Sequence, residues 1–339
     1  MGWALFGDRL ARDVVEVRHD LDGLGRGFWA LVVTFEGAVT AVRFGTVEPA
    51  SRAASSPVWA PLTGAWRTSL DEAAYLAAVE EVREGIAAGD VYQVNVCRVL
   101  SHPLREDADV AGLGILLAAG NPAPYAATVV VPEAGLEVVS ASPEAFLLRR
   151  GERLSSRPIK GTATSAETML AKDFAENVMI VDLVRNDLSH VCRPGTVAVD
   201  HLCVVERHPG LVHLVSQVSG RLRPGVTWPQ VLEATFPPGS VSGAPKSSAL
   251  RAIADLEPEP RGPYCGAIGW VDGDRDEARL AVGIRTFWAE RDGEGGKWLR
   301  FGAGSGITWG SDPGAEWRET QLKADRLVGL ASGTVRVGR

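Results

Sequence analysis

The first third of the chain combines strand-like and helix-like hydrophobic patterns. The stretch "FWALVVTFEGAVTAVRFG" contains two apolar runs separated by a short turn, which predicts a pair of strands. The proline-broken stretch "EPASRAASSPVWAPLTG" predicts a linker. Residues 69–89 then place apolar side chains at helical spacing, so we expect a helix. Ser69 is its expected N-cap, Glu72 completes a capping box, and Gly89 ends it.

The next stretch, "VYQVNVCRVL", predicts a strand with two amide side chains on one face. Strict alternation places Gln93, Asn95 and Cys97 on that face. Amides on an otherwise apolar strand can satisfy buried backbone groups, or they can line a ligand pocket. The pattern leaves both interpretations open.

Further patterns extend to the end of the chain. Strands rarely alternate strictly with helices, which indicates a mixed α+β architecture. Asp312 is the expected N-cap of the last helix, with Pro313 at its first position. Strands are expected within residues 127–161, 193–225, 264–288 and 297–310, and helices at about 168–188, 228–235, 245–255 and from residue 313 onward.

Composition and charge exclude several classes of protein. The 339 residues suggest two domains or one large domain. A net charge of −7 and the lack of a lysine–arginine run argue against nucleic acid or an anionic membrane as a partner. No apolar run of 18 residues occurs, and the early charges do not fit a secretory signal. The four cysteines form no CxxC pair, so we expect reduced thiols in a cytoplasmic protein.

Charged residues in the last helix are the first candidates for chemistry. Glu316, Glu319 and Lys323 are spaced three and four apart, so they share one face. They can form a solvated surface ion pair, or they can hold Mg²⁺, which prefers one or two carboxylates and water. Glu176, beside the apolar stripe of the helix at 168–188, is either a boundary residue or a further ligand.

Two cations or bases lie in unusual contexts. Lys160 follows "SSRPI" and precedes Gly161, so it falls where an extended segment meets a tight turn. Taken alone, it can be a surface lysine. His213 lies in the apolar run "GLVHLVSQV", where a hydrogen-bonded core histidine is the simple interpretation.

Seven segments occur in an order that resembles the chorismate-utilising enzymes: "RPIKGT", "AENVMIVDLVRNDL", "VHLVSQVSG", "FPPGSVSGAPK", "GPYCGAIGWV", "GIRTFW" and "FGAGSGITWGSDPGAEWRET". That family includes anthranilate synthase component I, aminodeoxychorismate synthase component I, isochorismate synthase and salicylate synthase. The resemblance covers about residues 68–330. It implies an α+β fold with two packed β-sheets, helices outside and a central substrate cleft. A short strand segment and linker (1–66), adding edge strands, would precede the catalytic domain (67–332).

"RPIKGT" is similar to the aminodeoxychorismate synthase branch, in which the lysine is a nucleophile. The resemblance implies that Lys160 attacks C2 of chorismate as the C4 hydroxyl leaves, and that ammonia then enters at C4 and expels the lysine. The product would be 4-amino-4-deoxychorismate, a precursor of 4-aminobenzoate and folate. This role requires a lowered lysine pKa. Gln93 takes the place of the lysine that activates water in the isochorismate and salicylate branch, which disfavours that branch.

The same resemblance assigns roles to other positions. Glu144 matches the general acid, a role that favours a raised pKa. His213 matches a histidine important in the anthranilate branch. Glu176, Glu316 and Glu319 match ligands of Mg²⁺. The positions implied to bind substrate are Gln93, Thr162, Ser242, Tyr264, Arg285, Gly304, Gly306 and Lys323.

Two alternatives remain beside this interpretation. One is anthranilate synthase component I, which usually carries a small residue at the position of Lys160. The other is a non-catalytic chorismate-binding protein. The chain keeps every residue that matches the family's acid, nucleophile and metal ligands, which argues against this alternative. The family also implies a glutamine amidotransferase subunit that supplies ammonia, or direct use of free ammonia.

Overall fold

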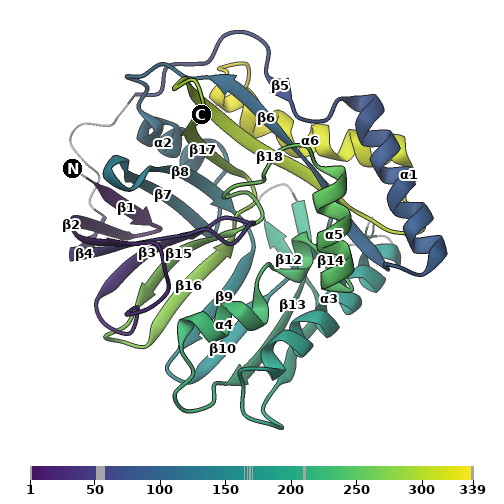
Figure 1. Ribbon diagram of the computed structural model, residues 1–339, viewed down its shortest axis with the longest axis horizontal. Helices are drawn as coiled ribbons and strands as arrows, with labels where there is room; N and C mark the ends of the chain where they lie inside the picture. Colours follow the sequence, from purple (N-terminus) through teal and green to yellow (C-terminus); the bar gives the residue numbers. More distant parts are fainter. Residues whose placement is uncertain are drawn as a thin grey trace.

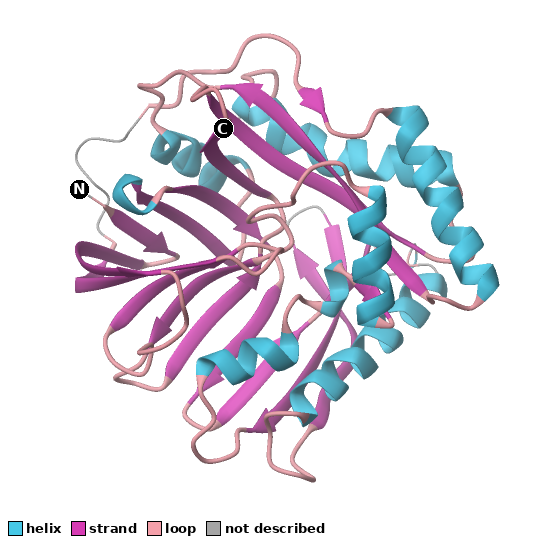
Figure 2. Ribbon diagram, viewed as in Figure 1, coloured by secondary structure: helices cyan, strands magenta, loops and turns pink. Residues whose placement is uncertain are grey.

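A computed structural model describes residues 2–50, 58–163, 165, 167, 169, 171–208 and 211–336. Strands and helices are both abundant in it, which confirms the α+β class (Figure 2). The strands are β1 (Trp3–Phe6), β2 (Arg9–Arg18), β3 (Phe28–Val33), β4 (Val39–Pro49), β5 (Arg67–Thr68), β6 (Gln93–Pro103), β7 (Tyr125–Val131), β8 (Leu136–Ser142), β9 (Ala145–Arg150), β10 (Arg153–Arg157), β11 (Ile159–Ala163), β12 (Ala198–His208), β13 (Leu211–Arg221), β14 (Gly243–Ala244), β15 (Ala267–Asp272), β16 (Glu277–Val282), β17 (Thr286–Arg291) and β18 (Lys297–Ile307). The helices are α1 (Glu72–Ala88), α2 (Val110–Gly120), α3 (Ala171–Ser189), α4 (Trp228–Thr235), α5 (Lys246–Leu256) and α6 (Pro313–Ala331).

The strands form two packed halves that hydrogen bonds join into one continuous ribbon. One half runs β6–β18–β17–β8–β7, and the other runs β15–β16–β9–β10–β13–β12. Strands β7 and β15 of the two halves are in contact, and a shared apolar core lies between the halves. Short strand β11 pairs with β13.

The N-terminal strands join the two halves, so the expectation that they would lie at an edge is wrong. Strand β1 pairs with β7 on one side, and β3 pairs with β15 on the other. Between them, β2 and β4 complete the ladder. All six residues of β3 are buried, which gives this segment too much apolar surface for an exposed edge. A domain boundary near residue 66 stays a prediction.

Helices cover the outer faces (Figure 1). Helix α6 packs on β18 and against α1 and α2, while α3 packs on β13, β11 and β12. Helix α5 covers β6 and β14. Two smaller apolar clusters hold α1, α2, α5 and α6 to the first half of the ribbon. No helix in the described ranges is long and apolar enough to span a bilayer.

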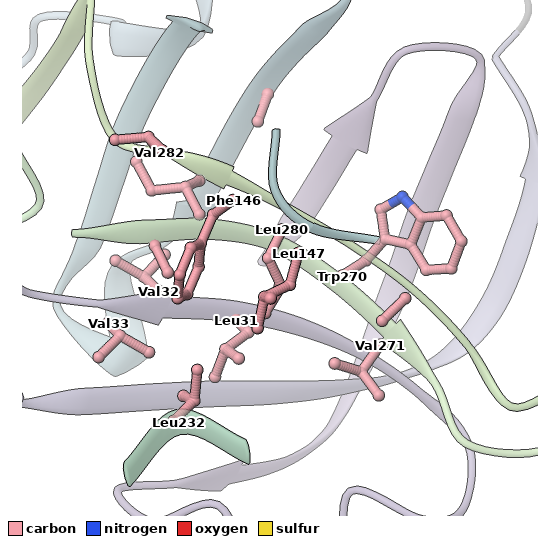
Figure 3. Packing of buried hydrophobic residues seen from close by; sticks show 14 of the residues in the cluster. Leu31, Val32, Val33, Phe146, Leu147, Leu232, Trp270, Val271, Leu280 and Val282 are labelled. Carbon is pink, nitrogen blue, oxygen red and sulfur yellow. The ribbon is translucent and has the colours of Figure 1, made fainter. Parts of the chain in front are cut away.

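The main core is built from apolar side chains of several neighbouring strands (Figure 3). Leu31 from β3, Leu147 from β9 and Leu280 from β16 are all almost fully removed from water. Leu232 of α4 adds a helical side chain to the same cluster. Burial of each such side chain contributes about 1.5–3 kcal/mol, so this core holds the frame on which the cleft residues are mounted.

Several local expectations hold and others need correction. Gly89 ends α1 with φ of 85°, and Asp312 caps α6 with Pro313 in its first turn, as predicted. The N-cap of α1 is Asp71 rather than Ser69, because the Asp71 carboxylate accepts a hydrogen bond from the Ala74 amide. Ser69 instead accepts a hydrogen bond from the amide of Val99.

The apolar stripe expected for the helix at 168–188 is also partly wrong. The stripe was expected at Met169, Leu170, Phe174, Val178, Val181 and Leu188; Leu170 lies outside the described residues. Val181 and Leu188 are buried, but Phe174 and Val178 are exposed, and Ile180 and Val184 are buried instead. The buried face of the helix is therefore only partly the one predicted. Helix α2 was not predicted, because its apolar residues do not repeat at a clear helical period. All four cysteines are free thiols, as expected.

Candidate active site

Lys160 lies on the short strand β11, at a local irregularity. The backbone pairs Lys160 with Leu214 and Thr162 with His213, and the register shifts between these two pairs. Gly161, at the shift, has φ of 78°, a conformation that favours glycine. The Lys160 side chain is half-buried and makes no hydrogen bond or ion pair with any residue that the structure describes. An amine without a fixed partner is free to act on a ligand.

Charged side chains from three other parts of the fold surround Lys160. Removal from water lowers the pKa of the Lys160 amine, and Lys323 of α6 acts in the same direction. The carboxylates of Glu176, Glu144 and Glu319 oppose that shift. The net direction is downward, so the neutral nucleophilic form of the amine is favoured relative to a solvated lysine.

Glu144 sits in the turn between β8 and β9 and is almost completely buried. Burial raises the pKa of its carboxyl to about 7. A hydrogen bond from the Ser240 hydroxyl, the positive charge of Lys160 and the backbone N–H of Ile159 moderate that rise. The group can therefore carry a proton near neutral pH, as a general acid must.

The three glutamates of the expected metal site come from two helices, Glu176 from α3 and Glu316 and Glu319 from α6. Glu316 is buried and accepts a hydrogen bond of 2.7 Å from the Ser311 hydroxyl, while Glu319 is 2.6 Å from Lys323. Burial raises the pKa of Glu176, and Glu316 adds to that rise, so the two carboxylates repel each other. Burial alone would raise the pKa of Glu319, but Lys323 brings it below its usual value.

The donor chemistry of these side chains fits a hard cation such as Mg²⁺. All of the donors are carboxylate oxygens, and a bound cation would relieve the repulsion between Glu176 and Glu316. In the described part of the chain, no three acidic, histidine or cysteine side chains already gather closely enough to hold an ion. Mg²⁺ commonly keeps several waters and needs only one or two carboxylates.

Gln93 and Asn95 point from β6 toward the same space as Lys160. Both side chains are buried, and three of their atoms have no hydrogen-bond partner among the described residues: Gln93 Nε2, Gln93 Oε1 and Asn95 Oδ1. A methyl group on Gly306 would lie 3.0 Å from Asn95 Oδ1 and 3.3 Å from Lys160 Nζ, and closer still to the Gln93 amide nitrogen. Buried amides without partners are costly, so these atoms favour the pocket interpretation of the strand.

Arg285 supplies a cation without a partner. Its guanidinium makes no hydrogen bond or ion pair with the described residues, and burial lowers its pKa. Its backbone has φ of 54°, an unusual conformation for a residue with a long side chain. A partly buried arginine that lacks a protein partner is suited to bind a carboxylate of a ligand.

Several of the remaining predicted residues make packing or hydrogen-bond contacts within the protein. Tyr264 is buried and packs its ring against Gly302, where a Cβ could not fit. Ser242 is buried, and its hydroxyl donates to the Pro238 carbonyl. Lys323 donates to the Gly304 carbonyl at 2.9 Å. The side chain of Thr162 lies outside the described residues.

His213 is buried on β13, and its backbone pairs with Thr162 on one side and Glu206 on the other. It therefore lies next to the strand that carries Lys160, one position away from the partner of Lys160.

Three residues of this region were not predicted as site residues. Asn95 was placed on the correct strand face, and its spacing from Gln93 was the available signal. Ser240 donates to Glu144 from the loop "FPPGSVSGAPK", where the motif was recognised but only Ser242 was predicted as a site residue. Arg261 is fully buried and donates to the carbonyls of Asn95 and Val241, so it fixes both β6 and that loop. Only the three-dimensional structure reveals that contact.

Comparison with known proteins places these residues in context. A family model described as chorismate binding enzyme matches residues 38–329. The chain is 41% identical over 278 residues to anthranilate synthase component 1 of Streptomyces coelicolor, covering 78% of this chain and 53% of that protein. It is 35% identical over 353 residues to aminodeoxychorismate synthase component 1 of Klebsiella aerogenes, covering 96% of this chain and 75% of that protein. The chain thus spans about half the length of the first of these relatives.

Solved structures show the same fold. Anthranilate synthase component I from Streptococcus pneumoniae superimposes with a TM-score of 0.75 at 24% identity, covering 92% of this chain and 82% of that chain. The menaquinone-specific isochorismate synthase of Escherichia coli superimposes with a TM-score of 0.81 at 19% identity, covering 98% and 89%. Similarity at this level of identity concerns the fold alone.

Proposed function

Because the chain belongs to the chorismate binding enzyme family, we propose that it is an aminodeoxychorismate synthase component I that uses Lys160 as a covalent nucleophile. The observation that carries this proposal is the Lys160 amine itself. It has no described partner, its pKa is lowered, and it lies beside Glu144 and the amide side chains of β6. The 35% identity to a relative of that name over 96% of this chain agrees with it.

In the proposed reaction, Lys160 Nζ bonds to C2 of chorismate while the ring double bonds shift and the C4–O bond breaks. Glu144 gives its proton to the departing hydroxyl, which leaves as water. Ammonia then bonds to C4, the C2–N bond breaks, and Lys160 leaves as the neutral amine. The product is 4-amino-4-deoxychorismate, with its enolpyruvyl group retained.

The other residues bind and orient the substrate in this proposal. Arg285 would pair with the carboxylate of the enolpyruvyl group, because it is the partly buried guanidinium without a described partner. Glu176, Glu316 and Glu319 would hold Mg²⁺, which when bound supplies positive charge to the ring carboxylate of the substrate. Gln93 cannot serve as a general base for water, so it favours an amine nucleophile over hydration.

Ammonia would reach the site from a separate glutamine amidotransferase subunit. The relatives from Streptomyces coelicolor and Klebsiella aerogenes are both named component 1, which supports the existence of a second component. We further propose that the enzyme acts in the cytoplasm and that its product is converted to 4-aminobenzoate for folate synthesis.

Anthranilate synthase component I is the second candidate, favoured by the 41% identity to the Streptomyces coelicolor relative. A product analysis separates the two. We would incubate the purified chain with chorismate, Mg²⁺ and ammonium at alkaline pH, with and without aminodeoxychorismate lyase, and identify products by mass spectrometry. 4-Aminobenzoate that appears only with the lyase supports the proposal. Anthranilate would refute it in favour of the second candidate, and untouched chorismate would favour a non-catalytic role or an obligatory partner.

A further inference from the structure

A small cavity lies beside Glu144 and does not include Lys160 in its lining. Its volume is about 20 Å³, and it is bounded by β9, β10, α3 and the loop after α4. Besides Glu144, the polar residues Ser156, Asp187, Thr235 and Ser240 line it. A space of roughly 10–15 Å³ with several polar neighbours is enough for one ordered water. Glu144 therefore lines this cavity and also interacts electrostatically with Lys160.

Asp187, which also lines the cavity, forms an ion pair that is partly exposed to solvent. Asp187 of α3 is 2.8 Å from the Lys246 ammonium of α5, and their side chains are 11% and 21% exposed. Lys246 also donates to the Thr235 carbonyl at 3.2 Å, which fixes the pair across three helices. Burial raises the pKa of Asp187, while the Lys246 ammonium and a hydrogen bond from Asn186 moderate that rise. A carboxylate near the protein surface thus shares one cavity with the buried Glu144.

The proposed reaction requires Glu144 to regain a proton in every turnover. Glu144 gives one proton to the hydroxyl that leaves as water. The incoming ammonia becomes an alkylammonium group at C4, which keeps its proton near neutral pH because such amines have pKa values of about 10. The proton of Glu144 must then come from solvent before the next turnover.

We propose that the cavity holds water and that Asp187 passes protons from solvent through it to Glu144, with Lys246 fixing the position of Asp187. No bond other than O–H bonds forms or breaks in this step. Asp187 takes a proton from solvent, the cavity water takes it from Asp187, and that water gives a proton to the Glu144 carboxylate. Asp187 is a positioning and relay residue that touches no substrate. The proposal rests on the general-acid role of Glu144 in the proposed function.

The first test measures proton exchange at Glu144 without substrate. At pH 6 the protonated carboxyl of Glu144 gives an infrared band that the difference between wild type and Glu144→Gln identifies. After rapid transfer to D₂O, we would follow the shift of this band in wild type, Asp187→Asn and Asp182→Asn. Asp182 is the matched control, since it lies on the same helix but its side chain is 70% exposed. We expect exchange to slow about tenfold or more in Asp187→Asn alone. Equal rates in all three proteins would overturn the proposal.

The second test uses turnover of chorismate with ammonium. We expect Asp187→Asn to lower kcat about tenfold with KM unchanged. A purely structural role would instead lower the thermal midpoint. Lys246→Met, which keeps the Asp187 carboxylate, should lose less kcat than Asp187→Asn. If wild type forms anthranilate instead of the amino product but exchange depends on Asp187, the proposed function fails while the proton path stands.

Discussion

The buried carboxyl of Glu144 leads to a quantitative prediction about stability and pH. Its pKa rises from an ordinary value of 4.5 to about 7 because it is removed from water. A group whose pKa is raised in the folded state stabilises the protein fully below the unfolded value, and that stabilisation is lost as the pH rises through the folded value. The difference between 4.5 and about 7 corresponds to about 3 kcal/mol.

The perturbation that tests this reasoning is Glu144→Gln. Glutamine keeps an oxygen to accept the hydrogen bonds from Ser240 and Ile159 but carries no charge. We expect the variant to be at least as stable as wild type at pH 8, and its advantage over wild type to shrink by about 3 kcal/mol between pH 8 and pH 4.5. Its catalytic turnover should be lost, because an amide cannot donate the proton to the leaving hydroxyl.

Urea unfolding at a series of pH values measures this difference, since the free energy of unfolding extrapolates linearly with denaturant. Glu84→Gln is the control, because Glu84 is exposed on α1. Its stability curve should stay parallel to that of wild type. If the Glu144→Gln curve were also parallel to wild type, Glu144 would not be a buried group with a raised pKa, and its assignment as the acid would lose its physical basis.

Three further predictions concern the cleft. Lys160→Ala should fold normally, with an unchanged thermal midpoint, but should form no covalent adduct and no amino product, as mass spectrometry of protein and products will show. Gly306→Ala should lower kcat/KM about a hundredfold, because the added methyl displaces the Gln93 amide and crowds Lys160 Nζ. Gly310→Ala, where nothing lies within 4 Å of the new methyl, should stay near wild type in the same assay. Arg285→Ala should raise KM for chorismate about 10- to 150-fold, as expected for a lost charged hydrogen bond, and an unchanged KM would remove Arg285 from the substrate site.

Much of the local structure follows from the sequence alone. Gly89 and Asp312 were predictable because a left-handed C-cap and an N-terminal carboxylate need particular residue types. Asp71 was missed because Ser69 and Glu72 formed an equally good capping pattern, and only the geometry of the first turn selects between them. The face of α3 was misjudged because Phe174 and Val178 continue its apolar period into solvent.

The candidate site was predictable only in part. Lys160, Glu144 and Glu176 stood in motifs, and the structure places them near one another. The pKa shifts of these side chains depend on how deeply each is buried, and the spacing of residues along the chain does not specify burial. The contact of Ser240 with Glu144 and the contact of Arg261 with β6 join segments about 100 and 165 residues apart in sequence, so periodicity carries no information about them.

The bridging position of the N-terminal strands has a consequence for synthesis on the ribosome. Strand β3 ends at Val33, but its partner β15 begins only at Ala267. At roughly 5–20 residues per second, this partner emerges about 12–50 seconds later. During that time the apolar residues of β3 can pair with β4 but cannot reach their final cover. The nascent chain therefore exposes an aggregation-prone strand for most of its synthesis. A chaperone that binds the N-terminal segment should raise the yield of folded protein.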